Sequence, residues 1–507
     1  MGYRNRRGTI NVIPTKTASE EKPEFAGDYI LKHVFIHNHV GEVVDVKNIM
    51  IELNIYESIY KNAVTGTIVI ADTTNQIAKL KIQGLERISF QLSTPGVKYG
   101  KEGVIDASEK TGHPFHVYKI TDRKQLNQNL TSYTLHFASR EFMRNLRTKV
   151  SQAYDGTLDR AVIDIMKDEN YLDSRKKLRF ETTGNKDKIV IPNLSPFDAI
   201  NMIASRSMPE KSNGVGYYFY ETTRGFNFRS WESMITSQGQ FAKVPKQQFY
   251  NQPLKMASET KQDKIEKEFE SVEAYEFVNN FHDVAINTIL GTYGHKVITH
   301  NLYTKSYDID DYGYHDEFSK TAHTDTIGKT GSYTTKFAVA HTPVDYDNAK
   351  NLSDYPESRV SLQPTSSFLH DEDVGRYGLD TKADGKKTGQ GVSQYNQIVH
   401  GTALKMTVKG QSYIQAGDLI EFNLVTEQSV RNADNDPRFS GNYVITKIRH
   451  KVDKTQYKMI LECAKDSVAT SYGSGSTNPM GYQDNPKTAS QETLQLEVIN
   501  NDWDFYI

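Results

Sequence analysis

The sequence has little of what marks a secreted, membrane or nucleic-acid-binding protein. Its one cysteine, Cys463, excludes an intramolecular disulfide framework and is expected to be a buried, inert thiol within a strand. No run of about 18 apolar residues occurs, so no membrane span is expected. No apolar segment follows Arg4, Arg6 and Arg7, so no signal peptide is expected. The net charge of -2 gives the chain no overall electrostatic attraction to nucleic acid or anionic membranes. We expect a soluble chain made in a reducing cytoplasm.

Two stretches resemble ligand-binding motifs but lack a required residue. Gly328-Lys329-Thr330 ends like a phosphate-binding P-loop, yet His323 stands where the first glycine of that motif is needed. Asp308–Gly313 begins like a calcium-binding loop, but its fifth position is Tyr312 and the twelfth is Ser319, where a bidentate glutamate is required. We therefore expect neither a nucleotide nor calcium at these positions.

No catalytic constellation stands out elsewhere. The sequence contains no HExxH, paired CxxC or GxSxG motif. His295 and His300 are expected to be packing or surface residues, and His370–Asp373 is expected to be a solvated acidic loop. No pair of carboxylates is singled out at the separation used by glycosidases. We assign no catalytic, cofactor-binding or metal-binding residue, and we expect that the chain is not an enzyme.

Tyrosine and phenylalanine are plentiful, at 30 and 22 residues, while hydrophobic residues as a whole make up only 37%. This mixture suits many short strands joined by polar loops. The 507 residues are enough for three or four domains.

Three segments in the C-terminal part alternate apolar and polar residues with the period of half-buried strands. They are Asp418–Leu424, Tyr443–Ile448 and Tyr457–Cys463, and Glu86–Arg140 holds three similar segments in the same order. The matched sets are Ile88, Phe90 and Leu92 with Ile420, Phe422 and Leu424; Phe115, Val117, Lys119 and Ile120 with Tyr443, Ile445, Lys447 and Ile448; and Tyr133, Leu135 and Phe137 with Tyr457, Met459 and Leu461. The sequence therefore predicts two copies of one antiparallel β-module, which in a trimer would make six similar modules in a closed ring.

Helical periodicity interrupts the strands between the two copies. Leu158–Met166 carries one apolar stripe behind the candidate N-cap Thr157. Ser195–Asp198 combines an N-cap serine, a proline at the first helical position and an acidic residue in the first turn, which predicts the start of a second helix after the apolar strand Lys188–Ile191. These elements indicate a small α/β segment.

The strand patterns then resume. Tyr217–Glu221 and Phe226–Ser230 predict a hairpin across the turn that ends in Gly225. Residues 261–270 are predicted to be helical or linking, and strands are predicted around Tyr275–Val284 and Ile286–Thr292.

Several of these segments also resemble one protein family, the baseplate hub proteins of contractile-tailed bacteriophages of the T-even type. The resemblance covers about residues 28–310 and 398–467. The segments that carry it are Val190–Ile200, Gly216–Thr222, Gly225–Ser230, Ser440–Ile448, Tyr457 and Lys465–Ser467. These motifs are structural, and they bring no catalytic residue, cofactor or metal ligand with them.

The resemblance implies a homotrimeric hub with two tube-like β-domains per subunit. Such a trimer mimics a hexameric ring, joins the hexameric tail tube to the trimeric central spike protein, and surrounds the genome-ejection channel. It implies tail tube subunits and the spike as partners, with tape measure and baseplate wedge proteins as further candidates, and no specific nucleic-acid recognition. The protein would lie in the tail baseplate of the virion after assembly in the host bacterial cytoplasm.

The predicted fold class is β-rich α+β and multidomain, with two tube-protein-like antiparallel β-barrel or sandwich domains, a small α/β domain and a loop-rich insertion. The predicted parts are a flexible N-terminal arm (1–25), the first tube-like domain (26–145 plus 212–250), the α/β domain (146–211), the second tube-like domain (251–309 plus 398–467), a polar insertion (310–397), and a linker with a C-terminal tail (468–507).

Two other classes of function are kept as alternatives. A tail-associated cell-wall hydrolase could carry its chemistry in residues 310–397, although that segment is poor in the aliphatic residues of a compact core. A carbohydrate-binding β-protein would use the many tyrosines, but most of these alternate within predicted strands, where packing explains them. The tail regains apolar alternation in Thr493–Ile507, and our hypothesis is that it docks on a neighbouring protein.

Overall fold

The computed structural model describes residues 22–73, 82–84, 86–96, 103–110, 112–127, 130–184, 186–236, 246–251, 261–279, 283–301, 305–318, 320–325, 352–364, 381–425, 435–436 and 439–467. The predicted tail (468–507), residues 1–21 of the predicted arm, Gly328-Lys329-Thr330 and His370–Asp373 lie outside the described residues.

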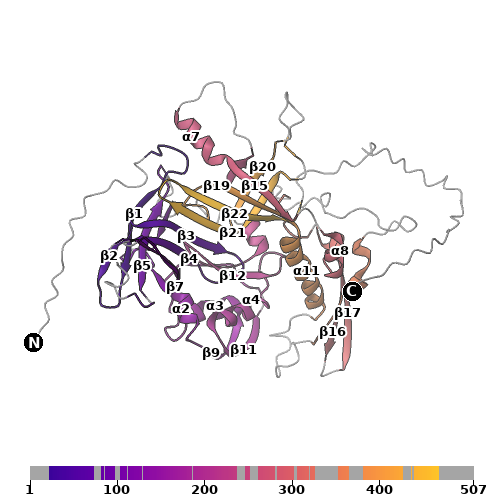
Figure 1. The fold of residues 1–507 in the computed structure, drawn as a ribbon. Helices are drawn as coiled ribbons and strands as arrows, with labels where there is room; N and C mark the ends of the chain where they lie inside the picture. The colour runs from indigo at the N-terminus through magenta and orange to yellow at the C-terminus, as the bar shows by residue number, and fades with distance from the viewer. Residues whose placement is uncertain are drawn as a thin grey trace, which may run out of the picture. The chain divides into compact units, whose positions relative to one another are not determined.

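Most strands join a single 14-stranded sheet (Figure 1). Its earlier strands are β1 (Ile30–His37), β2 (Val43–Asp45), β3 (Met50–Ser58), β4 (Thr65–Asp72), β5 (Arg87–Ser93), β6 (Val104–Asp106), β7 (Phe115–Asn127) and β8 (Leu130–Ala138). Its later strands are β14 (Gln247–Tyr250), β15 (Val272–Asn279), β19 (Thr402–Lys409), β20 (Leu419–Asn423), β21 (Gly441–Asp453) and β22 (Tyr457–Lys465). The main path runs β15-β19-β22-β21-β3-β4-β8-β7-β5-β1-β2, and helix α7 (Lys261–Glu270) precedes β15.

One face of this sheet is the main hydrophobic core. Leu53 and Ile55 on β3 occupy alternate positions of their strand, as do Met459 and Leu461 on β22, and all four side chains are fully buried. They belong to one cluster that includes residues of both the earlier and the later strands. The period-2 patterns therefore bury their apolar residues on one side and leave a polar face on the other.

A small α/β part with its own core lies between the two sets of strands in the sequence. Its elements are α2 (Arg140–Asn145), β9 (Val150–Thr157), α3 (Leu158–Lys167), β10 (Leu178–Phe180), β11 (Lys186–Leu194), α4 (Pro196–Ala204), β12 (Tyr217–Thr222), β13 (Gly225–Ser230) and α5 (Trp231–Thr236). The predicted start of α4 is confirmed, because the Ser195 hydroxyl accepts a hydrogen bond from the Asp198 backbone N–H at 3.4 Å. Thr157 stands at the N-cap of α3 but makes no side-chain capping bond.

The predicted hairpin is confirmed as β12 and β13, but it packs with the α/β part and not with the predicted first β-domain. Phe219 and Phe226 contact Phe197 of α4, and β13 pairs in parallel with β10. These aromatic side chains need a large apolar partner, and the helices of the α/β part provide it. Strand β14, also within residues 212–250, pairs instead with β20.

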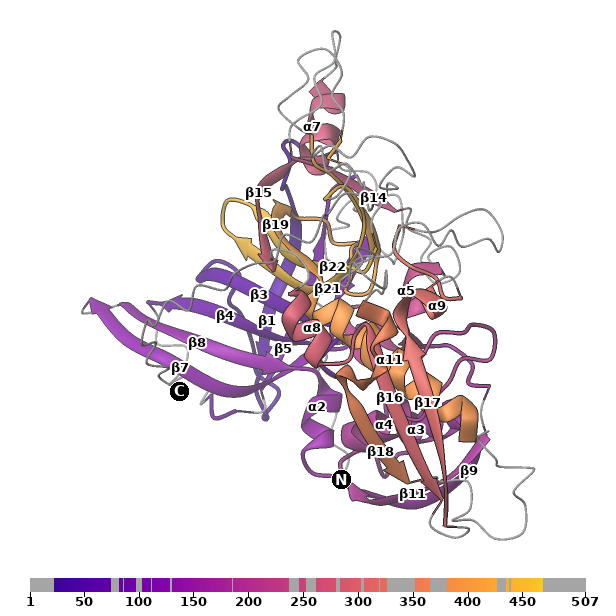
Figure 2. The same cartoon turned by 90° about the vertical axis from the view of Figure 1, so that its right-hand side faces the viewer.

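The described residues between 283 and 400 form a second small part around the sheet β17-β16-β18. Its elements are α8 (Val284–Ile289), β16 (Gly294–Asn301), β17 (Ser306–Gly313), α9 (Tyr314–Phe318), the 3-10 turns η3 (Leu352–Asp354) and η4 (Pro356–Ser358), β18 (Val360–Pro364) and α11 (Thr381–His400). Helix α11 runs beside this sheet in both views (Figures 1 and 2).

Two expectations for this region are wrong. The strand predicted at Ile286–Thr292 does not form, because Ile286–Ile289 belong to helix α8, which the Asp283 side chain caps by accepting a hydrogen bond from the Ile286 N–H at 2.9 Å. The same helix contains Val284, the last residue of the strand predicted around Tyr275–Val284. The predicted insertion boundary at residue 310 falls inside β17, so the region is not simply a long loop. Its core is aromatic, with Tyr293, Tyr312, Tyr314 and Phe318, and a scarcity of aliphatic residues is therefore no sign of a loop here.

The strand-rich, multidomain fold class predicted from the sequence is confirmed. Within the described part of the chain, none of the helices combines the length and the apolar composition that crossing a bilayer requires.

Candidate functional site

The structure extends the predicted repeat from three strands to five. Strands β3-β4-β8-β7-β5, which we call module A, lie in the same order and antiparallel pairing as β15-β19-β22-β21-β20, which we call module B. The prediction of a duplicated β-module is confirmed.

Irregularities of the sheet are repeated as well. On β7, the register against β8 shifts between Val117 and Lys119, and on β21 it shifts at the matching place between Ile445 and Lys447. The first strand of each module has a second matching shift, between Met50 and Glu52 in β3 and between Val272 and Ala274 in β15. A bulge is a specific local feature, so two shared positions argue strongly for a true repeat.

The predicted alignment of the third strand is wrong by two residues. Ile120 pairs with Leu135, and its counterpart Ile448 pairs with Leu461, so Leu135 corresponds to Leu461 and not to Met459. A shift of two residues keeps every side chain on the same face, and the alternating pattern alone cannot detect it.

The two modules join edge to edge within the chain. Lys447–Asp453 of β21 pairs antiparallel with Glu52–Ser58 of β3. On the polar face of this junction, Glu52 lies 3.2 Å from Arg449 and 3.0 Å from Lys451.

A buried carboxylate fixes the same junction from within. Glu57 accepts hydrogen bonds from the backbone N–H groups of Thr223 at 2.7 Å and Ala416 at 2.9 Å, and it lies 3.9 Å from His450 Nε2. Burial opposes ionisation of Glu57, but His450 and the two backbone donors outweigh it and hold the pKa of this carboxyl below its usual value. One side chain thus ties module A, the β12–β13 turn and module B together.

The junction strands β21 and β3 correspond to β7 and β15 in the other module, and β7 and β15 are edge strands. Among the described strands, none pairs with the outer side of β15, or with residues 119–127 of β7 on the side away from β8. Figure 2 shows the β7–β8 hairpin projecting from the sheet. Leu126 on β7 and Tyr275 and Val278 on β15 are 55%, 43% and 55% exposed. Unpaired edges of this length are sites for adding another strand.

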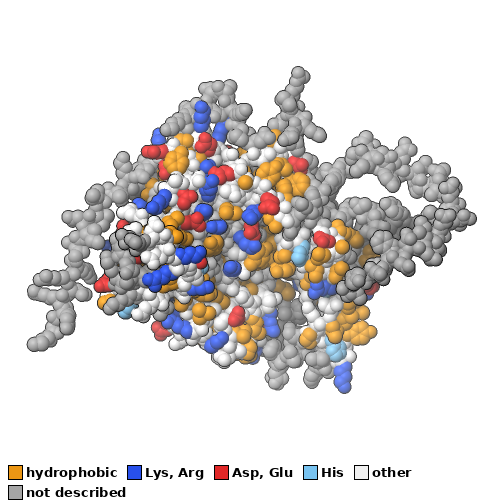
Figure 3. All heavy atoms as spheres, in the orientation of Figure 1, with side chains coloured by type: hydrophobic (Ala, Val, Ile, Leu, Met, Phe, Trp, Pro, Cys, Tyr) orange, Lys and Arg blue, Asp and Glu red, His pale blue; other side chains and the backbone are white. Residues whose placement is uncertain are grey.

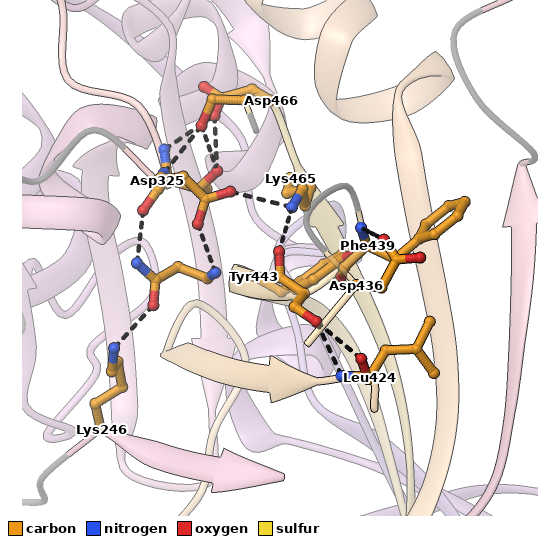
Figure 4. A network of polar contacts seen from close by, with 12 residues as sticks. Lys246, Asp325, Leu424, Asp436, Phe439, Tyr443, Lys465 and Asp466 are labelled. Atoms are coloured by element: carbon orange, nitrogen blue, oxygen red, sulfur yellow. Dashed lines mark hydrogen bonds and ion pairs between the residues drawn. The ribbon is translucent and has the colours of Figure 1, made fainter. Parts of the chain in front are cut away.

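The strand ends of module B hold a buried polar network (Figure 4). The Lys465 ammonium lies 3.1 Å from Asp325 Oδ2 and donates to the Ser440 carbonyl at 2.9 Å. Asp325 Oδ1 accepts from the Asn442 N–H at 2.7 Å. Ser440, Asn442 and Lys465 all come from segments that carry the family resemblance, so these motif residues have a structural role.

Asp466 extends this network to a distant segment. Its carboxylate accepts hydrogen bonds from the Thr324 N–H and hydroxyl, each at 3.0 Å, lies 3.0 Å from His323 Nδ1, and accepts from Trp231 Nε1 at 3.4 Å. Burial alone would raise the pKa of Asp466, but His323 and the Thr324 donors lower it to about 2. The pair His323–Asp466 therefore anchors residues 323–325 to the end of β22.

A third buried cluster links the α/β part to module A. Lys176 Nζ lies 2.7 Å from Glu141 Oε2 and 2.5 Å from Glu221 Oε1, and Glu221 accepts from the Val64 N–H at 2.9 Å. Burial would lower the pKa of Lys176, but the two carboxylates outweigh it and raise that pKa. Burial also raises the pKa of Glu221. Nothing in the sequence near these residues signals that they meet.

The residues weighed as ligands in the sequence have structural positions. Asp308–Gly313 lies in strand β17 and does not form a calcium-binding loop. His295 is buried and shares a hydrogen bond with the Ser361 hydroxyl at 2.9 Å. Cys463 is buried as predicted, and burial raises the pKa of its thiol. Within the described ranges, no group of three or more His, Cys, Asp or Glu side chains is placed to hold a metal ion.

Comparisons with known proteins agree with the sequence resemblance. No protein-family model matches the chain. The probable baseplate hub protein gp334 of Vibrio phage KVP40 is 19% identical over 432 residues, which cover 83% of this chain and 91% of that protein. The resemblance to phage baseplate hub proteins is thereby confirmed.

Two solved structures, one of a phage tail protein and one of a secretion-system component, match most of this chain at low sequence identity. The 43 kDa tail protein of prophage MuSo2 from Shewanella oneidensis is 10% identical, with a TM-score of 0.47, and the match covers 87% of this chain and 99% of that chain. The E. coli c3393 protein, a component of the type VI secretion system, is 8% identical, with a TM-score of 0.38, and the match covers 88% of this chain and 79% of that chain.

Proposed function

We propose that the chain is a structural subunit of a phage baseplate hub and assembles as a homotrimeric ring with pseudo-sixfold symmetry. The ring would join a hexameric tail tube to a trimeric central spike and surround the genome-ejection channel in the virion tail. The hub assignment is supported by the relative in Vibrio phage KVP40, and the ring is supported by the geometry of the sheet.

The observation that carries the ring is the junction between modules A and B. Within the chain, β21 of module B pairs with β3 of module A. The counterpart of β21 is β7 and the counterpart of β3 is β15, and these are the two edges described above. Repeating the internal junction between chains would pair β7 of one subunit with β15 of the next, and head-to-tail contacts of this kind close into rings.

Charge on the two edges is complementary. Strand β7 carries Lys119, Arg123 and Lys124 with one acidic residue, Asp122, and β15 carries Glu273 and Glu276 with no lysine or arginine. Opposite charges on facing strands favour pairing and register, whereas like charges oppose them.

The mass of the purified protein in solution tests the ring. Light scattering after size exclusion should give about three times the chain mass of 57.6 kDa. A monomer that stays monomeric at high concentration and on co-expression with the spike protein would contradict the proposal. We expect no catalytic activity, and clearing of host cell wall in a zymogram would contradict that expectation.

A further inference from the structure

Helix α8 presents three exposed aliphatic side chains a few residues after the edge strand β15. Val284 and Ile286 are nearly half exposed, and Ile289 is 71% exposed. Ile286 and Ile289 are three positions apart, so they lie on one face of the helix. Figure 3 shows hydrophobic side chains at the surface where Figure 1 shows α8. Such a face gains free energy when a partner removes it from water.

A second apolar surface begins on the other edge strand, β7. The exposed Tyr118 has its ring centroid 6.0 Å from that of Phe142 on α2. Leu146, the C-cap of α2, donates its N–H to the Phe142 carbonyl one helical turn before it, and its side chain is 63% exposed. These three side chains, which we call the Tyr118 strip, run from the edge strand onto the helix that follows β8.

The junction within the chain indicates what should meet this strip. Directly after β3, the Ile59 N–H donates to the Thr446 carbonyl of β21 at 3.0 Å, so the chain that leaves β3 crosses onto β21. Thr446 lies at the register shift of β21, and Tyr118 lies at the matching shift of β7. Tyr118 is therefore the counterpart of the residue that receives this crossing.

The same crossing between subunits would bring α8 to the strip. Asn279 of β15 is the counterpart of Tyr56 of β3. Asp283, the N-cap of α8, stands four residues after Asn279, as Tyr60 stands four residues after Tyr56. In a ring that pairs β7 with β15, the start of α8 in one subunit would therefore lie beside Tyr118 of its neighbour.

We propose that the aliphatic face of α8 packs on the Tyr118 strip of a neighbouring copy of this chain. The inference rests on the proposed function, because it uses the pairing of β7 with β15 between subunits. A second copy is the expected occupant, because each apolar surface begins at one of the two edge strands that this pairing joins. A closed trimer would contain the contact three times.

Photo-cross-linking of the full-length protein tests what covers α8. Benzoylphenylalanine in place of Ile289 should, on irradiation, join one chain to the Tyr118 strip of another, and mass spectrometry of the cross-linked peptides would identify that segment. The matched control carries the same group in place of Leu362, which is also 71% exposed but lies on β18, outside both modules. The control should not join to the strip.

Substitutions measure the strength of the contact. Ile286→Ser/Ile289→Ser should raise at least tenfold the protein concentration at which the trimer dissociates in sedimentation, because apolar area is lost from the interface at three places. The matched control Ile309→Ser/Leu362→Ser removes exposed side chains of β17 and β18 and should dissociate like the wild type. Leu146→Ser should also weaken the trimer, and adding it to the α8 variant should weaken it little further, because both remove the same contact. If the α8 variant does not fold, Leu146→Ser replaces it.

The outcomes separate the two proposals. A trimer in which position 289 cross-links only to other surfaces, or in which the α8 variant and its control dissociate alike, overturns the inference and leaves the ring intact. A wild type that stays monomeric, alone and with the spike protein, overturns the ring and the inference with it.

Discussion

Pairing of β7 with β15 between subunits predicts which residues face each other. Within the chain, Lys451 of β21 is paired with Asn54 of β3. The repeat makes Lys124 the counterpart of Lys451 and Glu276 the counterpart of Asn54. Lys124 of one subunit should therefore lie directly opposite Glu276 of the next.

In the variant Lys124→Cys/Glu276→Cys, this register would allow a disulfide bond to form between neighbouring subunits. Directly opposed residues of antiparallel strands have Cβ atoms about 4.5–5.5 Å apart, and a disulfide needs about 3.5–4.5 Å, which a small local adjustment supplies. Cys463 is buried and should not interfere. A slip by two residues would move the partner by about 6.8 Å, and a slip by one would turn it to the other face.

After mild oxidation, a non-reducing gel should show covalent dimer and trimer. A thiol reductant should cleave the disulfides and return both to monomer. The matched control is Lys124→Cys/Ala274→Cys, with the second cysteine two residues along β15, and it should cross-link much more slowly. If the control forms trimer as readily as the test variant, or if neither forms it while light scattering reports a trimer, the proposed pairing of β7 with β15 is refuted.

Two further predictions concern the buried charges. Lys176→Met should lower the free energy of unfolding by about 3–5 kcal/mol, because it leaves Glu141 and Glu221 buried without a cation. In urea unfolding this loss should become smaller as the pH falls, because the raised pKa of Glu221 lets that carboxyl become neutral. The triple variant that adds Glu141→Gln and Glu221→Gln should recover most of the lost stability. Glu57→Gln should cost about 2–3 kcal/mol, because an amide NH2 group would face a backbone donor, while the matched surface change Glu52→Gln should cost under about 1 kcal/mol. The pKa of Glu57 lies below its unfolded value of about 4.3, so the stabilisation is fully present at neutral pH and is lost as the pH falls through the lower folded pKa, below which the wild type and Glu57→Gln should converge in urea unfolding.

The sequence predicts the local elements well where one pattern decides them. Ser195–Asp198 does start α4, and the hairpin of β12 and β13 pairs as its turn residues indicate. Ile286–Thr292 fails because its apolar residues fit either a strand or a helix, and the cap at Asp283 decides for the helix.

The first two strands of each module are not visible as a repeat in the sequence. In module A, β3 and β4 are joined by a short connection, whereas in module B the chain between β15 and β19 contains a whole second small part. Their side chains differ too, since Tyr275 and Phe277 of β15 stand where Leu53 and Ile55 stand in β3. Only the pairing register reveals the correspondence.

The buried clusters could not be predicted for a different reason. Asp466 meets His323 over a separation of 143 residues, and Lys176 meets Glu221 over 45. Each of these residues alone resembles an ordinary charged surface residue, because no periodicity or spacing in the sequence relates it to its partner. Contacts of this kind depend on the folded topology and not on a local pattern.

The duplication explains how one chain could serve a threefold and a sixfold partner together. The junction within the chain is reinforced by Glu57, which holds Thr223 and Ala416 beneath it. Asn279 of β15 is the counterpart of Tyr56, and the next residue in the sequence is Asn280, so the carboxylate of Glu57 has no equivalent there. In a ring, strong internal junctions would therefore alternate with weaker junctions between subunits. The polar face, whose strand order and two of whose bulges are shared by both modules, would repeat six times, while the reinforced junctions would repeat three times and mark the true symmetry of the ring.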